Sequence, residues 1–351
     1  MTNKVDRCVG GKVAKQQCVG ELQLPLNNCG VMALDFESKN GIATSIGHSP
    51  ISGLIDPVAG SRNSIAESLT NIIWAPIEGN IKGLSLSANW MWPCKNKGED
   101  ARLYSAVEAV SKFAIDLGIN IPTGKDSLSM NQKYSNLEVK SPGTVIISAT
   151  GHCNDITKVV EPVFKKNYGS IYYINLSQDK FKLGGSSFSQ IIGNIGNETP
   201  TIQNSDFFKN AFNIIQDLIR RDLIIAGHDI GSGGLITSLL EMCFPSINIS
   251  ADIDLSSLNE NDIGDFKTFL KLSPPLRLED DRVALVEGIN EGLIDVIVSD
   301  HVPEDEESKR LPFAQAATGA IGIETLLPLA LELYHNESLS LSKIIETLTT
   351  V

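Results

Sequence analysis

The sequence predicts an α/β or α+β fold, because strand and helix patterns alternate along roughly the first 250 residues. The chain has 351 residues, which is long enough for two domains with separate cores. Its hydrophobic content of 42% and charged content of 20% are typical of a soluble globular protein. These observations together favour a multidomain globular protein over a fibrous, disordered or membrane-embedded one.

The first predicted domain covers residues 1–155. It opens with a strand, a turn and a second strand over 30–45. A helix is expected over 64–73, because Ser64 and Glu67 have capping-box spacing and apolar residues then recur at helical intervals. The remaining predicted elements are a strand, a helix and a buried strand, over 81–88, 101–117 and 144–149.

The second predicted domain covers residues 156–257. Its predicted strands lie over 171–174 and 223–226, and its predicted helices over 207–220 and 235–242. Glycine-rich turns are expected at 183–186 and 228–234. This alternation again indicates an α/β domain.

The distribution of charged residues separates a third region from the two predicted domains. Residues 258–351 carry 18 acidic and 7 basic side chains, whereas the first 257 residues carry 24 and 22. Such a change in composition marks a candidate boundary, so residues 258–351 are treated as a separate region.

The overall composition excludes several classes of function. A net charge of −13 argues against nucleic acid as a partner, because phosphate contacts need excess positive charge. No apolar run approaches about 18 residues, so no membrane partner is expected. The polar N-terminus has no secretory signal, and the six cysteines form no CxxC pair, so we expect reduced thiols and a cytoplasmic location.

Glu67 and Asn71 form the first candidate site. They are four residues apart on a predicted helix, so their oxygens face the same way. A carboxylate and an amide oxygen on one face suit a hard cation such as Mg²⁺, which also takes phosphates and water as ligands. Alternatively, Glu67 caps the helix and Asn71 is a surface residue.

The second candidate is the turn at 228–234, between a predicted strand and a predicted helix. Its glycines would let main-chain N–H groups approach an anion, and Asp229 could hold a metal that bridges phosphates. Alternatively, Asp229 only caps the helix that follows. A third stretch, 124–130, lacks the spacing of a phosphate-binding Walker A loop. A turn in which Lys125 pairs with Asp126 is one of two open interpretations of this stretch, and a functional role of Lys125 is the other.

Residues from about 6 to 256 resemble the large, single-chain form of formylglycinamidine ribonucleotide synthetase. The resemblance is carried, in order, by DRCVGG (6–11), LPLNNC (24–29), SIGHSP (45–50), ESLTN (67–71), LSANWM (86–91), GEDARLY (98–104), PTGKDSLSM (122–130), LGGS (183–186) and HD (228–229). That family is an ATP- and glutamine-dependent ligase of purine biosynthesis. The resemblance implies a two-domain unit of the aminoimidazole ribonucleotide synthetase type, here truncated.

The resemblance further implies that this chain is the second synthetase half, which holds a nucleotide diphosphate with Mg²⁺ without turnover. Carried over by position, Glu67, Asn71 and Asp229 match metal ligands, and Asn28 stands where the family has a fourth, an aspartate. By the same resemblance, the nucleotide-binding residues are Asn27 and Gly231. ADP or ATP and Mg²⁺ are therefore the expected cofactors. The catalytic first half and the glutaminase domain are expected as missing partners, so this chain alone is expected to be inactive.

Residues 258–351 resemble a different family, the dihydroorotases, which are zinc amidohydrolases built on a (β/α)₈ barrel. The matching stretches are NENDIGD (259–265), KLSPPLR (271–277), EDDR (279–282), IDVIVSDH (294–301), KRLPF (309–313) and GIETLLP (322–328). Asp300, expected to end a buried strand, matches the catalytic aspartate.

Zinc is an expected cofactor only if this second resemblance holds. The metal-binding histidines of the early barrel strands are not in the chain, so this region is not expected to carry out zinc-dependent hydrolysis by itself. The junction near 257 is then a natural fusion or a joined reading frame, and we favour the second because neither part keeps a complete site. Three functions stay open: part of a C–N ligase, a dihydroorotase-like hydrolase, or a non-catalytic nucleotide-binding module.

Overall fold

The computed structural model describes residues 11–166, 169–247, 249, 251, 279–309, 317–323 and 325–349. The chain divides into two compact units, Met1–Ile253 and Asp254–Val351. The predicted boundary between residues 257 and 258 lies outside the described residues, as does the first predicted motif up to residue 10. No helix in the described part of the chain is both long enough and apolar enough to cross a bilayer.

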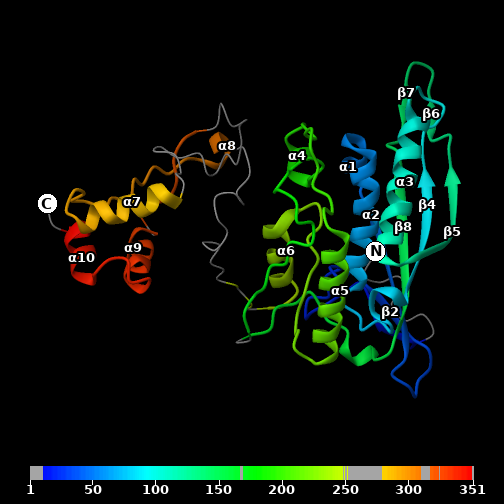
Figure 1. The fold of residues 1–351 in the computed structure, drawn as a ribbon, viewed down its shortest axis with the longest axis horizontal. Coiled ribbons are helices and arrows are strands. Elements are labelled where there is room, and N and C mark those ends of the chain that lie inside the picture. Colours follow the sequence, from blue (N-terminus) through cyan, green and yellow to red (C-terminus); the bar gives the residue numbers. More distant parts are fainter. Residues whose placement is uncertain are drawn as a thin grey trace. The chain divides into compact units, whose positions relative to one another are not determined.

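A six-stranded sheet is the frame of the first unit (Figure 1). Its strands, in spatial order, are β1 (Val13–Lys15), β2 (Gly30–Ala33), β3 (Gly41–His48), β8 (Thr144–Cys153), β4 (Leu84–Met91) and β5 (Asn120–Ser127). All neighbours are antiparallel except β4 and β5, which are parallel and joined by helix α3 (Glu99–Leu117). A separate hairpin, β6 (Asn131–Lys133) and β7 (Glu138–Lys140), follows β5. This mixed sheet confirms the α/β character predicted for the region.

The predicted strand–turn–strand over 30–45 is confirmed. Strands β2 and β3 pair from Gly30 with Thr44 to Ala33 with Gly41, and the Asp35 carboxylate accepts the Ser38 main-chain N–H at 2.6 Å in the turn. Strand β8 confirms the strand predicted over 144–149. The strand predicted over 81–88 begins later, because a short 3₁₀ helix (Asn80–Gly83) precedes β4.

The helix predicted over 64–73 begins earlier than expected. Helix α2 spans Pro57–Ile72, and Asp56 is its N-cap, with a carboxylate that accepts the Val58 N–H at 2.8 Å. An Asp cap followed by Pro at the first helical position starts a helix more strongly than a mid-helix serine. The Ser64 hydroxyl instead donates to the Gly60 carbonyl at 3.1 Å, so the predicted capping box was wrong.

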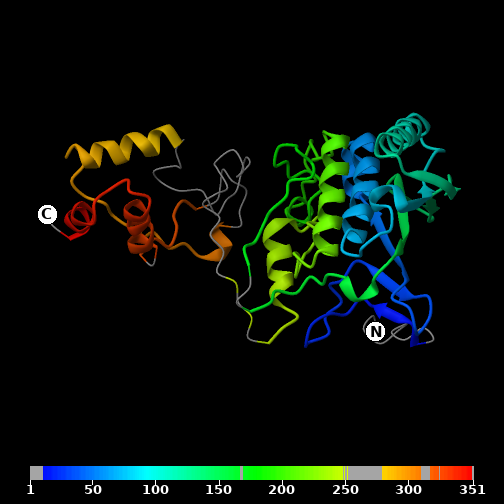
Figure 2. The same cartoon turned by 60° about the horizontal axis from the view of Figure 1, so that its bottom comes forward.

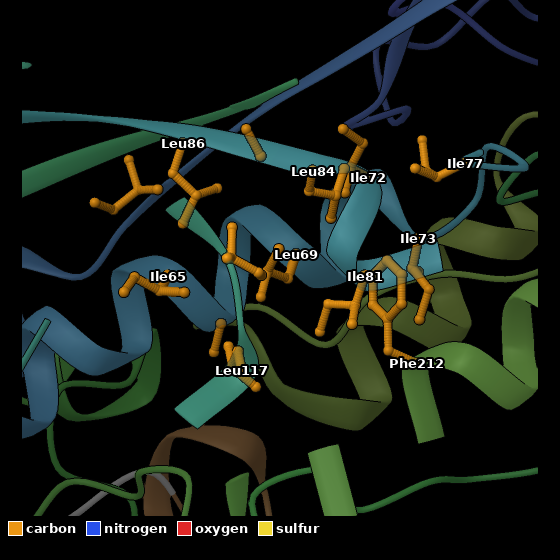
Figure 3. Packing of buried hydrophobic residues seen from close by; sticks show 14 of the residues in the cluster. Ile65, Leu69, Ile72, Ile73, Ile77, Ile81, Leu84, Leu86, Leu117 and Phe212 are labelled. Atoms are coloured by element: carbon orange, nitrogen blue, oxygen red, sulfur yellow. The ribbon is translucent and has the colours of Figure 1, made fainter. Parts of the chain in front are cut away.

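Helices α2 and α3 cover one face of the sheet, and helix α5 (Ser205–Arg220) packs on them from the side away from the sheet (Figure 2). The core between these layers is formed largely by isoleucine and leucine side chains of α2, β4 and the loop between them (Figure 3). The rings of Phe113 on α3 and Phe208 on α5 meet edge to face at 6.0 Å between centroids. Alternate residues of β3 are buried against the helices, as the period of two requires.

Glycine at position 47 allows helix α2 to lie directly on β3. A Cβ there would come within 2.2 Å of both the Ser64 carbonyl oxygen and the Ser68 nitrogen, which are main-chain atoms of α2. The hydroxyl of Ser45 also donates to the Ser68 carbonyl at 2.6 Å. This close approach brings the polar face of α2 to the end of β3.

The second predicted domain has its helices but not its strands. Helix α4 (Ser187–Ile191), helix α5 and helix α6 (Gly234–Cys243) are present. The segments 171–174 and 223–226, predicted as strands, pair with no other strand among the described residues, and Tyr172 and Leu223 are exposed. Apolar composition alone does not make a strand, because a strand needs a neighbour for its main-chain ladder.

The second unit contains helices α7 (Glu279–Asn290), α8 (Glu306–Lys309), α9 (Leu326–His335) and α10 (Leu341–Thr349). Its small core comprises Ile289, Ala330, Leu339 and Ile344. The buried strand expected to end at Asp300 is wrong: residues 294–300 form no strand, and Val298 is 71% exposed. The described part of this unit offers no strand for it to pair with, so the structure gives no support to a barrel fragment.

Candidate functional site

Side chains from three separate elements converge beside the end of β3. Asn28 lies two residues before the start of β2, Glu67 and Asn71 lie on α2, and Asp229 lies in the turn before α6. Asn28, Ile46 and Asn71 line the same hollow, and the Ile46 carbonyl accepts the Asn71 amide. Three of the four predicted metal ligands therefore come from the first domain, and the fourth comes from the second.

Glu67 is half-buried and directed at the end of β3. Its carboxylate accepts the main-chain N–H of His48 at 2.6 Å. Burial raises the pKa of Glu67, the hydrogen bond from His48 opposes that shift, and the negative charge of Asp229 adds to it. The Glu67 and Asp229 carboxylates are thus close enough to interact electrostatically. A cation between them would relieve both the burial of charge and this repulsion.

Asn71 is buried, with 5% of its surface exposed. Its amide nitrogen donates to the Ile46 carbonyl at 2.8 Å, while its amide oxygen is buried and has no hydrogen-bond partner. Such an unpartnered acceptor is costly unless a donor or cation meets it. The alternative in which Glu67 caps the helix and Asn71 is a surface residue is wrong, because α2 begins at Pro57 and Asn71 is buried.

Asp229 is held from both sides. The Asn28 amide nitrogen lies 3.1 and 3.2 Å from its two carboxylate oxygens, across 201 residues of sequence. The His228 ring nitrogen Nδ1 lies 3.3 Å from Asp229 Oδ1, and the Ser238 hydroxyl donates to the Asp229 carbonyl at 3.0 Å. Its side chain is 8% exposed. Asn28 thus orients Asp229 through nitrogen, and its oxygen would have to replace the nitrogen for Asn28 to coordinate a cation.

His228 and Glu241 are part of this arrangement, although neither was predicted as a site residue; His228 was noted only as part of the HD motif at 228–229. His228 Nε2 lies 2.9 Å from Glu241 Oε2 on α6, so the ring has a carboxylate at each nitrogen. Burial by itself lowers the pKa of His228, but the hydrogen bonds and charges of Asp229 and Glu241 outweigh it and raise the pKa. The spacing of 13 residues between His228 and Glu241 gives no motif, which is why sequence patterns missed the pair.

The two predicted nucleotide-binding residues lie in different environments. Gly231 is exposed in the turn before α6, and a Cβ built there would meet nothing within 4 Å. Asn27 is buried, and its amide nitrogen donates to the carbonyls of Gln16 and Cys29. Asn27 therefore holds the loop before β2, and its contact with a nucleotide stays a prediction.

The donor set suits a hard cation if amide oxygens take part. Glu67 and Asp229 supply two carboxylates, and the unpartnered oxygen of Asn71 supplies a third donor; oxygen ligands of this kind are those that Mg²⁺ prefers. In the described part of the chain, no group of three or more His, Cys, Asp and Glu side chains is arranged to hold a metal. Asn28 and Asn71 also line a hollow of about 550 Å³ above the open face of the sheet, whose walls carry serine and threonine hydroxyls.

The other predicted features do not join this site. Asp300 is exposed and has a φ of 40°, and the neighbouring His301 uses Nδ1 to accept the N–H groups of Gly322 and Ile323 at 3.1 and 3.2 Å. Of the two interpretations of Lys125, the structure does not show the pairing with Asp126: the Lys125 ammonium group donates to the Ser127 hydroxyl at 2.6 Å.

Two family models match the chain. Residues 1–152 match the FGAR-AT PurM_N-like domain, and residues 176–304 match the C-terminal domain of AIR synthase related proteins. The second match continues past residue 257, after which the dihydroorotase-like region was expected to begin, and neither of these two family models is that of a dihydroorotase.

The chain is also similar in sequence to several curated proteins of one kind. The chain is 44% identical over 273 residues to a probable phosphoribosylformylglycinamidine synthase of Caenorhabditis elegans, covering 74% of this chain and 20% of that protein. It is 42% identical over 281 residues to a probable chloroplastic/mitochondrial phosphoribosylformylglycinamidine synthase of Arabidopsis thaliana, covering 80% and 20%. It is 40% identical over 257 residues to the Homo sapiens phosphoribosylformylglycinamidine synthase, covering 73% and 19%. The chain thus spans about a fifth of the length of these relatives.

Proposed function

We propose that this chain, which is related to the phosphoribosylformylglycinamidine synthases and carries their AIR synthase-like domains, is a nucleotide-holding part of such a ligase. The whole enzyme would use ATP and glutamine to amidate formylglycinamide ribonucleotide in purine biosynthesis, forming a C–N bond. This part would bind ADP or ATP with Mg²⁺. The working active site and the glutaminase would be supplied by other parts of the enzyme, which are its proposed partners.

The observation that carries the proposal is the convergence of Glu67, Asn71 and Asp229 from two domains. Two carboxylates that interact electrostatically and one unpartnered buried oxygen are favourable neighbours for Mg²⁺. These three side chains would hold the cation, which would offset the negative charge of the nucleotide phosphates beside the carboxylates. The exposed turn at Gly231 and the first turn of α6 would then present main-chain N–H groups to the phosphates.

A calorimetric titration of the full chain with ADP tests this function. We expect ADP to bind with a stoichiometry near one in the presence of Mg²⁺ and at least about tenfold more weakly in EDTA, because the cation removes the repulsion between phosphates and carboxylates. No binding of ADP or ATP in Mg²⁺ would contradict the proposal. Equal affinity in Mg²⁺ and EDTA would contradict the cation site alone.

The sequence resemblance of residues 258–351 to dihydroorotase leaves one alternative proposal, a hydrolase-like zinc site at Asp300, although the described residues around Asp300 form no group of three or more His, Cys, Asp and Glu side chains that could hold the metal. Its support is the sequence IDVIVSDH at 294–301. Zinc retained by the purified chain and lost on Asp300→Ala would agree with it, whereas a zinc-free chain would exclude this hydrolase-like function.

A further inference from the structure

His228 is a buried ring placed between two carboxylates, one of which belongs to the proposed cation site. Its side chain is 5% exposed, with Asp229 Oδ1 at 3.3 Å from Nδ1 and Glu241 Oε2 at 2.9 Å from Nε2. The Nε2 atom is at hydrogen-bond distance from Glu241, and the longer Nδ1 contact places the edge of the ring against the Asp229 carboxylate. The ring therefore lies between the two carboxylates and contacts both of them.

The Asp229 carboxylate lies near a second negative charge, so a contact that fixes its orientation favours the proposed site. The Glu67 carboxylate repels it, and the only other side-chain group bonded to its carboxylate in the described structure is the Asn28 amide. If a cation takes one of the two oxygens, Asn28 can keep at most part of its contact. The His228 contact to Oδ1 would then fix the rotation of the carboxylate and leave Oδ2 for the cation.

Glu241 completes the arrangement from α6. Its side chain is 31% exposed, so it can change without opening a buried cavity, and its contact with Nε2 fixes the plane of the ring. The Ser238 hydroxyl, one turn earlier on the same helix, holds the Asp229 main chain. Helix α6 thus supports both the main chain and the side chain of Asp229.

We propose that His228, oriented by Glu241, is a positioning residue that holds the Asp229 carboxylate in the orientation that accepts the cation. This inference rests on the proposed function, since it concerns the same Mg²⁺–nucleotide site. Partners of this kind, one step behind the metal ligand, typically contribute a factor of about 10–100 to metal affinity. If this is so, a change at His228 lowers the affinity for ADP measured in Mg²⁺ and leaves the affinity measured in EDTA unchanged.

The experiment compares His228→Ala, His228→Asn, Glu241→Gln and Glu241→Leu in the full chain, with His152→Ala as a matched control. His152 is also paired with a glutamate, Glu78 at 3.7 Å, but lies 53% exposed on the surface. ADP affinity is measured in Mg²⁺ and in EDTA, and bound Mn²⁺ is counted by electron paramagnetic resonance in the presence of ADP.

We expect His228→Ala to weaken ADP binding in Mg²⁺ by about 10–100-fold and to leave binding in EDTA within about threefold of wild type. His228→Asn keeps a donor near the position of Nδ1 and should recover most of the loss. Glu241→Gln keeps an acceptor for Nε2 and should resemble wild type, whereas Glu241→Leu should follow His228→Ala in direction.

Three results would overturn the inference while leaving the proposed function intact. They are wild-type Mn²⁺ and ADP binding in His228→Ala, an equal loss of affinity in Mg²⁺ and EDTA, and no recovery by His228→Asn despite an unchanged melting temperature. Failure of the wild-type chain to bind ADP in Mg²⁺ would instead overturn the proposed function itself.

Discussion

Replacing Asp229 by Asn is expected to reduce Mg²⁺-dependent ADP binding by at least about 100-fold, since even residues behind a metal ligand cost about 10–100-fold. Asn keeps the size of the side chain but removes a negative charge from a position where a cation must be balanced. It also lets the Asn28 amide face another amide in place of a carboxylate. The loss should therefore appear in Mg²⁺ and be much smaller in EDTA.

The matched control is Asp206→Asn, an exposed aspartate in the first turn of α5. It removes the same charge from the chain, so an effect of net charge would appear in both variants. Isothermal titration with ADP measures the affinities. If Asp229→Asn bound ADP in Mg²⁺ with the wild-type affinity, the Asp229 carboxylate would not be a ligand of the cation, even if the chain binds the nucleotide.

Replacing Gln216 by Leu is expected to lower the free energy of unfolding of the first unit by about 3–5 kcal/mol, because several buried main-chain groups lose their partners at about 1–3 kcal/mol each. Gln216, on α5, is fully buried. Its amide nitrogen donates to the carbonyls of Ile73 and Ala75 at 2.5 and 3.0 Å, and its oxygen accepts the Ile77 N–H at 2.7 Å. Leucine has a similar volume, so the effect isolates the hydrogen bonds rather than a cavity.

Urea unfolding followed by tryptophan fluorescence measures this loss, since Trp92 is buried and Trp74 packs against the core. Gln190→Leu, at an exposed position on α4, is the control and should stay within about 0.5 kcal/mol of wild type. A change below about 1 kcal/mol in Gln216→Leu would mean that water or relaxation replaces these hydrogen bonds.

Local patterns predicted the first domain well. The strands at 30–45 and 144–149 and the helix at 101–117 are formed because each has the period of its element and packs on the same core. The start of α2 was missed because Ser64 and Glu67 imitate a capping box, while Asp56–Pro57 is the real start signal. Local sequence does not show which of the two signals, Asp56–Pro57 or Ser64, starts the helix, because that depends on how far the face of α2 packed against the sheet extends.

The predicted strands at 171–174 and 223–226 failed for a different reason. Their composition favours strands, but a strand is stabilised by its neighbour, and local sequence says nothing about whether that neighbour is available. The segment at 294–298 failed in the same way. Such elements depend on long-range pairing and cannot be settled by a short window of sequence.

In the candidate site, too, some residues were predicted from the sequence and others are found only in the structure. Helical spacing and family resemblance suggested Glu67, Asn71, Asp229 and Asn28, and the structure brings these four together. It assigns Asn28 a nitrogen contact that the resemblance did not foresee, and it adds His228 and Glu241 behind Asp229. Those contacts join residues without regular spacing, so only the folded arrangement reveals them.

The most direct test of the nucleotide–cation site is a crystal of the full chain grown with ADP and Mn²⁺, with the ion located by its anomalous scattering. We expect one Mn²⁺ peak within coordination distance of oxygens of Glu67, Asn71 and Asp229, with ADP phosphate oxygens among its other ligands. ADP bound with its phosphates and Mn²⁺ away from these three side chains would contradict it.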